Sequence, residues 1–202
     1  IDGLLEHTNN QTQVELLSEK VAMDFGDLFR HPLQLDLIEG ELMVARENND
    51  WLISSDNLYI FNSDLELNTR LIFSVVEQGA IFSDIQSDFR NVIAASLYKY
   101  YPVSIMSNEL VDWLEMAITD GFVASGSFIM HGDLSRFPYP DNDGVMQVVF
   151  DTDYLTLKFL DDWPVLRDLS SNVRFHNSSM LISDASGKTY RGKMTGANVL
   201  IP

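Results

Sequence analysis

Acidic clusters are the residues of this sequence whose types and spacing come nearest to a chemical motif. Asp141-Asn142-Asp143-Gly144 begins like a calcium-binding loop, but the third acidic position and the distant bidentate glutamate of that loop do not follow. A β-turn that closes on Gly144 accounts for the run better. A pair of carboxylates for glycoside hydrolysis stays open at this point, because such pairs have no fixed spacing in a sequence.

The histidines and serines form no catalytic or metal-binding pattern. The four histidines, His7, His31, His131 and His176, do not stand at metal-ligand spacings from one another. The sequence has no Gly-x-Ser-x-Gly elbow, no Walker loop, no G-x-G-x-x-G motif and no cysteine. We therefore expect no catalytic residue, no metal ion and no cofactor, and we predict that the protein is not an enzyme.

The net charge excludes several classes of partner. The chain has 30 acidic side chains against 13 basic ones, which gives a formal charge of −17 at pH 7. Phosphate backbones and anionic lipid headgroups would both be repelled, so we expect no nucleic acid partner and no direct adsorption to a membrane. The sequence contains no run of 18 apolar residues, which is about the length needed to span a membrane. Because the chain begins at Ile1 and ends in an apolar run, we expect an excised piece whose membrane contacts lie in parts outside it.

The elements that position these side chains are predicted to be mainly β-strands. Apolar and polar residues alternate with period two through most of the chain, and polar turn residues separate the segments. Residues 145–150 and 154–160 are predicted to pair as a hairpin around Asp151-Thr152-Asp153. We expect antiparallel strands over residues 14–25, 33–37, 41–45, 51–54, 58–61, 65–73, 122–131, 145–150, 154–160, 173–176, 180–182 and 190–201.

Two short helices interrupt this pattern. Leu110, Leu114 and Ile118 recur every four residues, which predicts a helix over residues 107–119 that packs on the sheet by these three side chains. Ser107 is suited to the N-cap and Gly121 to the residue after the C-terminus. A shorter helical segment is predicted near residues 94–98.

The apolar phases of the strands predict a groove. Side chains alternate between the two faces of a strand, so the apolar phase of each strand can converge on one surface. A long curved sheet could leave that surface open, whereas Lys158 and other polar residues of the opposite phase would face water. Trp163 precedes a proline, and its indole is expected to tuck against a sheet face. The candidate groove residues are Phe122, Phe128, Met130, Val148, Phe150, Leu155, Leu157, Phe159 and Met194.

An ordered series of short motifs carries a resemblance to a known family. The series includes Tyr100-Tyr101-Pro102, Trp113-Leu114, His131-Gly132, Phe137-Pro138-Tyr139, Gly144-Val145-Met146-Gln147-Val148, Asp162-Trp163-Pro164 and Phe175-His176-Asn177. Leu28-Phe29-Arg30-His31-Pro32-Leu33 and Ser55-Asp56-Asn57-Leu58 precede it. In these motifs, and over most of its length, the chain resembles the YhdP-type proteins of the AsmA-like superfamily.

The resemblance implies a fold, a role and a location. Proteins of this type are long bacterial bridge-like lipid transport proteins, anchored in the inner membrane of Gram-negative bacteria. Their periplasmic body is a mainly β structure, a curved antiparallel sheet with a taco-like apolar groove and one or two short helices. The implied function is carriage of phospholipid, held by its acyl chains, between inner and outer membranes in support of the outer-membrane barrier. No catalytic residue or metal ligand is implied.

Residues 1–202 are accordingly expected to form one segment of a larger β-groove domain in the periplasm, with a possible sub-boundary near residues 78–106. Neighbouring segments of the same long chain would then be partners. Two alternatives remain at this stage. One is a closed β-sandwich, acting as a scaffold or adhesion module that binds a protein partner. The other is an envelope hydrolase with a carboxylate pair that the sequence does not reveal.

Overall fold

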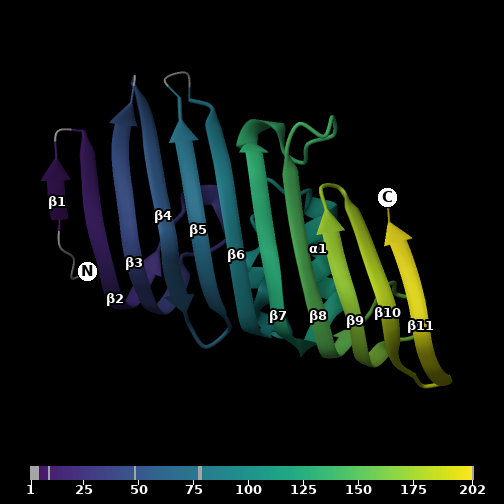
Figure 1. The fold of residues 1–202 in the computed structure, drawn as a ribbon. Helices are drawn as coiled ribbons and strands as arrows, with labels where there is room; N and C mark the ends of the chain where they lie inside the picture. Colours follow the sequence, from purple (N-terminus) through teal and green to yellow (C-terminus); the bar gives the residue numbers. More distant parts are fainter. Residues whose placement is uncertain (1–4, 9, 48, 77–78, 202) are drawn as a thin grey trace.

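A single antiparallel sheet dominates the computed structural model, which describes residues 5–8, 10–47, 49–76 and 79–201. Its strands follow the order of the chain, so each pairs with its neighbours in the sequence (Figure 1). The prediction of a mainly β, antiparallel structure is confirmed. The strands are β1 (Leu5–Thr8), β2 (Gln11–Met23), β3 (Leu33–Glu47), β4 (Asp50–Phe61), β5 (Glu66–Val75), β6 (Ile81–Ile93), β7 (Ile118–Asp133), β8 (Val145–Leu157), β9 (Leu166–His176), β10 (Ser179–Thr189) and β11 (Gly192–Ile201).

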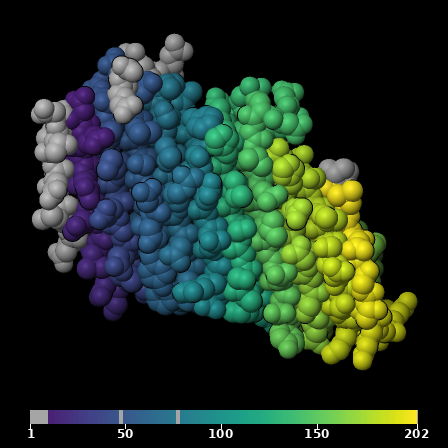
Figure 2. All heavy atoms as spheres, viewed as in Figure 1, coloured from purple at the N-terminus to yellow at the C-terminus, as the bar shows by residue number. Residues whose placement is uncertain are grey.

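The sheet is curved and does not close. β1 and β11 form its outer edges, and within the described residues they pair only with β2 and β10. The closed β-sandwich considered from the sequence is therefore wrong for this part of the chain. Figure 2 shows the face turned to the viewer in Figure 1, where the strands lie side by side as one continuous surface.

Successive connections alternate between two rims, because the strands form a meander. The upper rim of Figure 1 carries the turns that follow the odd-numbered strands, and the lower rim carries those that follow the even-numbered ones. The lower rim therefore consists of residues 24–32, 62–65, 94–117, 158–165 and 190–191. It includes the 3-10 helices η1 (Gly26–Leu28) and η2 (Ala94–Tyr100), whereas η3 (Leu134–Arg136) lies in the connection from β7 to β8.

The α-helix forms where the sequence predicts it, but its packing differs. α1 spans Asn108–Ala117, and the Ser107 side chain caps it by accepting a hydrogen bond from the backbone N–H of Leu110. Val111, Leu114 and Ala117 are its buried residues. Leu110 was expected to pack on the sheet but is 41% exposed, so that part of the prediction is wrong.

The end of α1 also differs from the prediction. Ile118 is already the first residue of β7, and its backbone N–H still bonds to the carbonyl of Leu114. Gly121 lies inside β7 rather than after the helix. Its φ of 132° and the lack of a side chain allow a close approach to β8, since a Cβ atom there would lie 2.6 Å from the Cα of Leu155.

Several predicted short strands prove to be parts of longer ones. Residues 33–37 and 41–45 both lie in β3, and residues 51–54 and 58–61 both lie in β4. The hairpin predicted around Asp151-Thr152-Asp153 is wrong, because the single strand β8 passes through it. Thr152 is only 2% exposed, and the register shifts between Thr152 and Leu155, where Tyr154 has a φ of 56°. The polar run that resembles a turn is a bulge within a strand.

The packing of α1 gives a matched pair of substitutions. We expect Leu114→Ala to lower the free energy of unfolding by about 2–5 kcal/mol, because it leaves a cavity beneath the helix. Leu110→Ala should change it by no more than about 0.5 kcal/mol, since that side chain is largely exposed. Urea unfolding of both variants measures the difference, and equal losses would contradict the observed orientation of the helix.

Candidate functional site

One face of the sheet carries apolar side chains that line up across nearly all of its strands. Residues directly opposite each other in an antiparallel pair point to the same face, so the register identifies the members of such a line. The apolar row consists of Ile38, Ile60, Leu67, Phe89, Gly126, Phe150, Val173, Ile182 and Val199, one from each strand from β3 to β11. At Gly126 a Cβ atom would lie 2.4 Å from the Phe89 ring, so that ring fills the space above the glycine.

The opposite face has a different character. The register links a second line of residues in the other phase, which contains three charged side chains as well as polar ones: Glu39, Tyr59, Asn68, Asp88, Ser127, Val149, Arg174 and Leu181. An antiparallel sheet with one apolar and one solvated face has this composition. The apolar row therefore marks a chemically distinct surface.

Hydroxyl groups on the apolar face bond mainly to one another or to the backbone. The side-chain oxygens of Thr69 and Ser87 are 2.7 Å apart, and those of Thr152 and Ser171 are 3.0 Å apart. All four residues are buried, so pairing removes most of the cost of taking these groups out of water. Ser55 differs, because its buried Oγ has no partner among the described residues.

Four of the predicted groove residues lie together on this face. Phe128 pairs with Val148 across β7 and β8, while Phe150 belongs to the apolar row. Met130 pairs with Met146, and it lies on the same face as Phe128, two residues nearer the upper rim. Met130 is buried and the other three predicted residues are half-buried. They form a contiguous patch that is only partly covered.

Three further predicted residues lie on the same face but under the helical connection. Leu155 and Leu157 are each 7% exposed and cluster with Ala94 and Ala117. Met194 of β11 packs against this cluster. In the structure they are part of a closed core.

The last two predicted residues lie elsewhere. Phe122 pairs with the exposed residues Ile93 and Asp153, whereas its neighbour Val123 is buried and pairs with Thr152. Phe122 therefore points to the opposite face, and the expectation that it shares the phase of Phe128 is wrong. The cause is a register shift between Val123 and Gly126, which reverses the alternation.

Phe159 lies in the connection from β8 to β9, within an aromatic group on the lower rim. Its ring is 5.7 Å from that of Trp113 and 5.5 Å from that of Trp163, and its carbonyl accepts a hydrogen bond from the Trp113 indole. Trp113 is thus anchored, but Trp163 is 57% exposed and does not tuck against the sheet as predicted. Lys158 bonds to Asp161, outside the apolar face.

The connection from β7 to β8, at the upper rim, contains a buried tyrosine, Tyr139, that the sequence analysis did not predict. Tyr139 is 1% exposed, and a Cβ atom at either Gly132 or Gly144 would collide with its ring. The adjacent acidic run is a turn in which Arg136 contacts Asp141 and Asp143. The position of Tyr139 between Gly132 and Gly144 in the sequence is the signal that could have indicated the buried ring.

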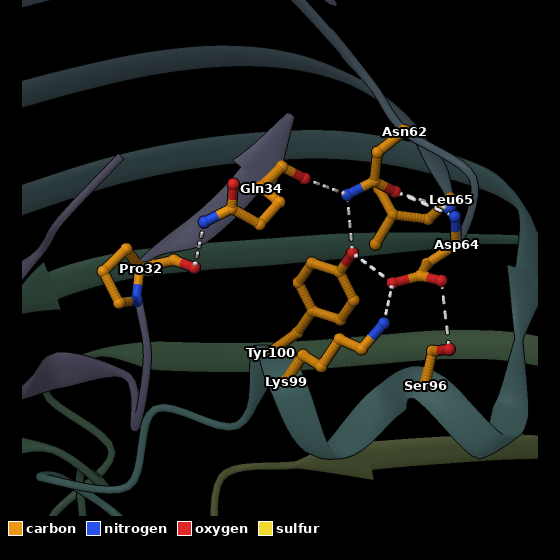
Figure 3. A network of polar contacts seen from close by, with 8 residues as sticks. All are labelled: Pro32, Gln34, Asn62, Asp64, Leu65, Ser96, Lys99 and Tyr100. Carbon is orange, nitrogen blue, oxygen red and sulfur yellow. Dashed lines mark hydrogen bonds and ion pairs between the residues drawn. The ribbon is translucent and has the colours of Figure 1, made fainter. Parts of the chain in front are cut away.

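A polar network on the lower rim joins the turn between β4 and β5 to η2 (Figure 3). The Asp64 carboxylate accepts hydrogen bonds from Ser96 at 3.0 Å, Lys99 at 2.6 Å and Tyr100 at 3.2 Å. Asn62 donates to the carbonyl of Gln34 at 2.8 Å, and its side-chain oxygen accepts from the backbone N–H groups of residues 64 and 65. The turn between β4 and β5 is therefore tied both to β3 and to the connection that leads to α1.

The network shifts the pKa values of its members. Burial would raise the pKa of Asp64, but the bonds from Lys99, Ser96 and Tyr100 outweigh it and hold this pKa below its usual 3.8. Burial also raises the pKa of Tyr100, with the negative charge of Asp64 acting in the same direction. Both groups are held in the protonation state that the bonds require at neutral pH.

Within the described part of the chain, no group of three His, Asp or Glu side chains could hold a metal ion. His131 lies on the opposite face, with its ring against Phe82 and its Nδ1 3.7 Å from Asp84. None of the described helices is long and apolar enough to cross a membrane. What the structure does offer is an extended apolar surface with few directional groups.

Comparison with known proteins identifies the family of the chain. The model of the YhdP protein family matches residues 1–202. The chain belongs to the YhdP family. This confirms the resemblance found in the sequence motifs.

One member of the YhdP family gives a named relative. The intermembrane phospholipid transporter YhdP of Escherichia coli (strain K12) is 24% identical over 168 residues, which make up 80% of this chain and 13% of that protein. The chain therefore spans only a small part of the length of this YhdP relative. No solved structure matches the chain.

The lowered pKa of Asp64 predicts a pH-dependent contribution to stability. A carboxyl with a depressed pKa stabilises the fold above its unfolded pKa, near 3.8, and loses that contribution as the pH falls through the folded value. We expect Asp64→Asn to lower the free energy of unfolding by about 1.5–3 kcal/mol at pH 7, because its bonds lose their charge. The deficit should shrink below about pH 4.

Urea unfolding at a series of pH values measures this effect. Asp161→Asn is the matched control, because Asp161 also pairs with a lysine but is 77% exposed, so its deficit should be much smaller. A deficit for Asp64→Asn that is independent of pH would contradict the role of its charge.

Proposed function

We propose that this chain is one segment of a lipid conduit that carries phospholipid between the inner and outer membranes. The apolar row carries the proposal, because it crosses nine strands without a charged side chain. The E. coli member of the family, described as an intermembrane phospholipid transporter, supports the same role. Through this role the parent protein would support the outer-membrane permeability barrier.

The physics of acyl chains suits such a surface. Burying a methylene group contributes about 0.8 kcal/mol, so a chain that is only partly covered is still held. The attraction is non-directional, and the polar atoms nearby are mostly paired with each other. An acyl chain can therefore move along the row without breaking specific bonds.

The length of the row also suits transport. Neighbouring strands lie about 4.8 Å apart, so a row across nine strands extends over roughly 38 Å. The hydrocarbon of one membrane leaflet is only about 15 Å thick. A lipid tail is thus shorter than the row and would have to travel along it.

The edges of the sheet define the partners of this segment. β1 and β11 are outer strands, and an outer strand exposes unpaired backbone N–H and C=O groups. We propose that neighbouring segments of the parent chain pair there and extend one larger β-groove domain. Residues 78–106, of which residue 78 lies outside the described residues, include all of β6, which pairs with both β5 and β7. We therefore treat residues 1–202 as a single segment.

The location follows from the same proposal. A segment between two membranes lies in the periplasm, and the anchor in the inner membrane belongs to parts of the parent protein outside these residues. The acidic surface disfavours direct contact of this segment with anionic headgroups. The proposed role requires no catalysis.

Site-specific photocrosslinking in cells tests the proposal. With a photoreactive amino acid at Phe128 of the full-length protein, we expect phospholipid adducts, because this side chain lies half-buried on the apolar face. Ile129 is the matched control, since it is adjacent and 36% exposed but points to the opposite face. Mass spectrometry of the adducts identifies the lipid.

Equal yields at positions 128 and 129 would show that the apolar face is not the path. The absence of lipid at both positions would remove the case for a conduit in this segment.

A further inference from the structure

The connection between β6 and β7 differs from the other connections of the described sheet. It has 24 residues (94–117), whereas the next longest (134–144) has 11. It does not simply turn at the rim, but folds back over the apolar face, with α1 behind β7 and β8 in the view of Figure 1. We call residues 94–117 the strap.

The strap covers part of the surface proposed to carry lipid. Ala94 and Ala117 pack against Leu155, Leu157 and Leu169, which are 7%, 7% and 2% exposed. These three leucines lie in β8 and β9 on the face of the apolar row, toward the lower rim. Nearer the upper rim of the same strands, Phe150 and Phe175 remain half-buried. The strap thus removes the lower half of the face from reach over these strands.

The outer side of the strap does not replace the surface that it hides. The exposed residues of α1 are Asn108, Glu109, Leu110, Asp112 and Met116, so two carboxylates and an amide interrupt its two apolar side chains. An acyl chain would gain little on this side, because burying a carboxylate is costly. A lipid tail could use the lower half of the face only if the strap moved away.

Polar contacts hold the strap at the lower rim. Ser96 and Tyr100 of the strap donate hydrogen bonds to Asp64, and the Trp113 indole donates one to the carbonyl of Phe159. Two ion pairs add to these bonds. Lys99 Nζ lies 2.6 Å from Asp64 in the turn between β4 and β5, as Figure 3 shows. Glu115 of α1 lies 2.7 Å from Nη1 of Arg30 in the connection between β2 and β3. The Lys99 and Arg30 side chains are 43% and 42% exposed, so water competes with both ion pairs. We call these two ion pairs the latches.

The packing behind the strap is incomplete. A pocket of about 330 Å³ that opens to solvent lies between the strap and the start of β7, lined by residues that include Ala95, Tyr98, Tyr101, Glu115 and Thr119. Side chains that line this open pocket face water on one side, so they contribute less packing attraction than a filled interface would. Segments held in this way are typical of those that open locally without global unfolding.

We propose that the strap is a reversible gate that the two latches help to hold closed in this structure. Loss of a latch makes the strap open more often and exposes the lower half of the apolar face over β8 and β9 to an acyl chain. The identity of the ligand rests on the proposed function. The opening itself is a property of the chain and can be measured without lipid.

Thiol labelling measures the opening, because residues 1–202 contain no cysteine. The reporter is Leu157→Cys in the full chain with no other reactive thiol, and its reaction with a maleimide is followed over time. Lys99→Ala and Arg30→Ala each remove one latch by changing an exposed side chain. We expect either of them to accelerate labelling at position 157 about five- to tenfold.

Two controls isolate the strap. Arg90→Ala removes an ion pair of the same kind, with Nε of Arg90 2.6 Å from Glu66, but that pair joins β6 to β5 and should leave the rate unchanged. Ala45→Cys places a second reporter at a buried site in β3 (3% exposed), whose labelling reports global unfolding. Unchanged rates at position 157 in both latch variants, or an equal rise at position 45, would overturn the gate.

Photocrosslinking at Phe128 separates this proposal from the lipid function, because Phe128 does not belong to the cluster under the strap. Lipid adducts at position 128 without accelerated labelling at 157 would overturn the gate and leave the conduit. Accelerated labelling without adducts would overturn the lipid function and leave a strap that moves.

Discussion

The alternation of side chains between the two faces is the constraint on which the rest of this structure depends. A slip of one residue in a strand moves its whole apolar set to the wrong face, so every irregularity must be matched by the neighbouring strand. Leu35 and Ile38 belong to one buried cluster although they are three residues apart. The pairing of β3 with β2 keeps its register across this point, where Lys20 has a φ of 51°. Both strands reverse their alternation together, and the apolar face continues unbroken.

This constraint explains what could be predicted from the sequence. The antiparallel strands, α1 and the cap at Ser107 follow from local periodicity and local hydrogen bonding, which a sequence contains directly. The face of Phe122 and the continuity of β8 through Thr152 could not be predicted, because a bulge is fixed by the opposing strand. The network around Asp64 was missed for a similar reason, since it joins residues that are more than 30 positions apart. Long-range pairing of this kind has no periodic signature.

Charged and polar side chains are distributed unevenly between the two faces of the sheet. Acidic residues occupy the solvated face and the rims, which keeps an open sheet soluble and discourages pairing with unrelated chains. The apolar face retains a few hydroxyl groups, but Thr152 and Ser171 satisfy each other there. The ion pairs of Lys99 and Arg30 lie at the lower rim, where they hold the strap without placing a charge on the apolar face. A segment can therefore be held in place from the edge while the face that it covers stays chemically uniform.

The strictly sequential order of the strands has a further consequence for how such a protein can change in evolution and how it can fold. Each strand contacts mainly its sequence neighbours, so the sheet behaves as a one-dimensional array whose units can be added or lost one beside another. Insertion of a two-stranded unit would lengthen the array by roughly 10 Å and leave every later loop on its original side. Insertion of a single strand would transfer all later loops to the other side and separate Arg30 from Glu115. The parity of the number of strands, rather than the total length, is therefore the quantity that such an array must conserve, and a chain that folds from one end could complete it strand by strand.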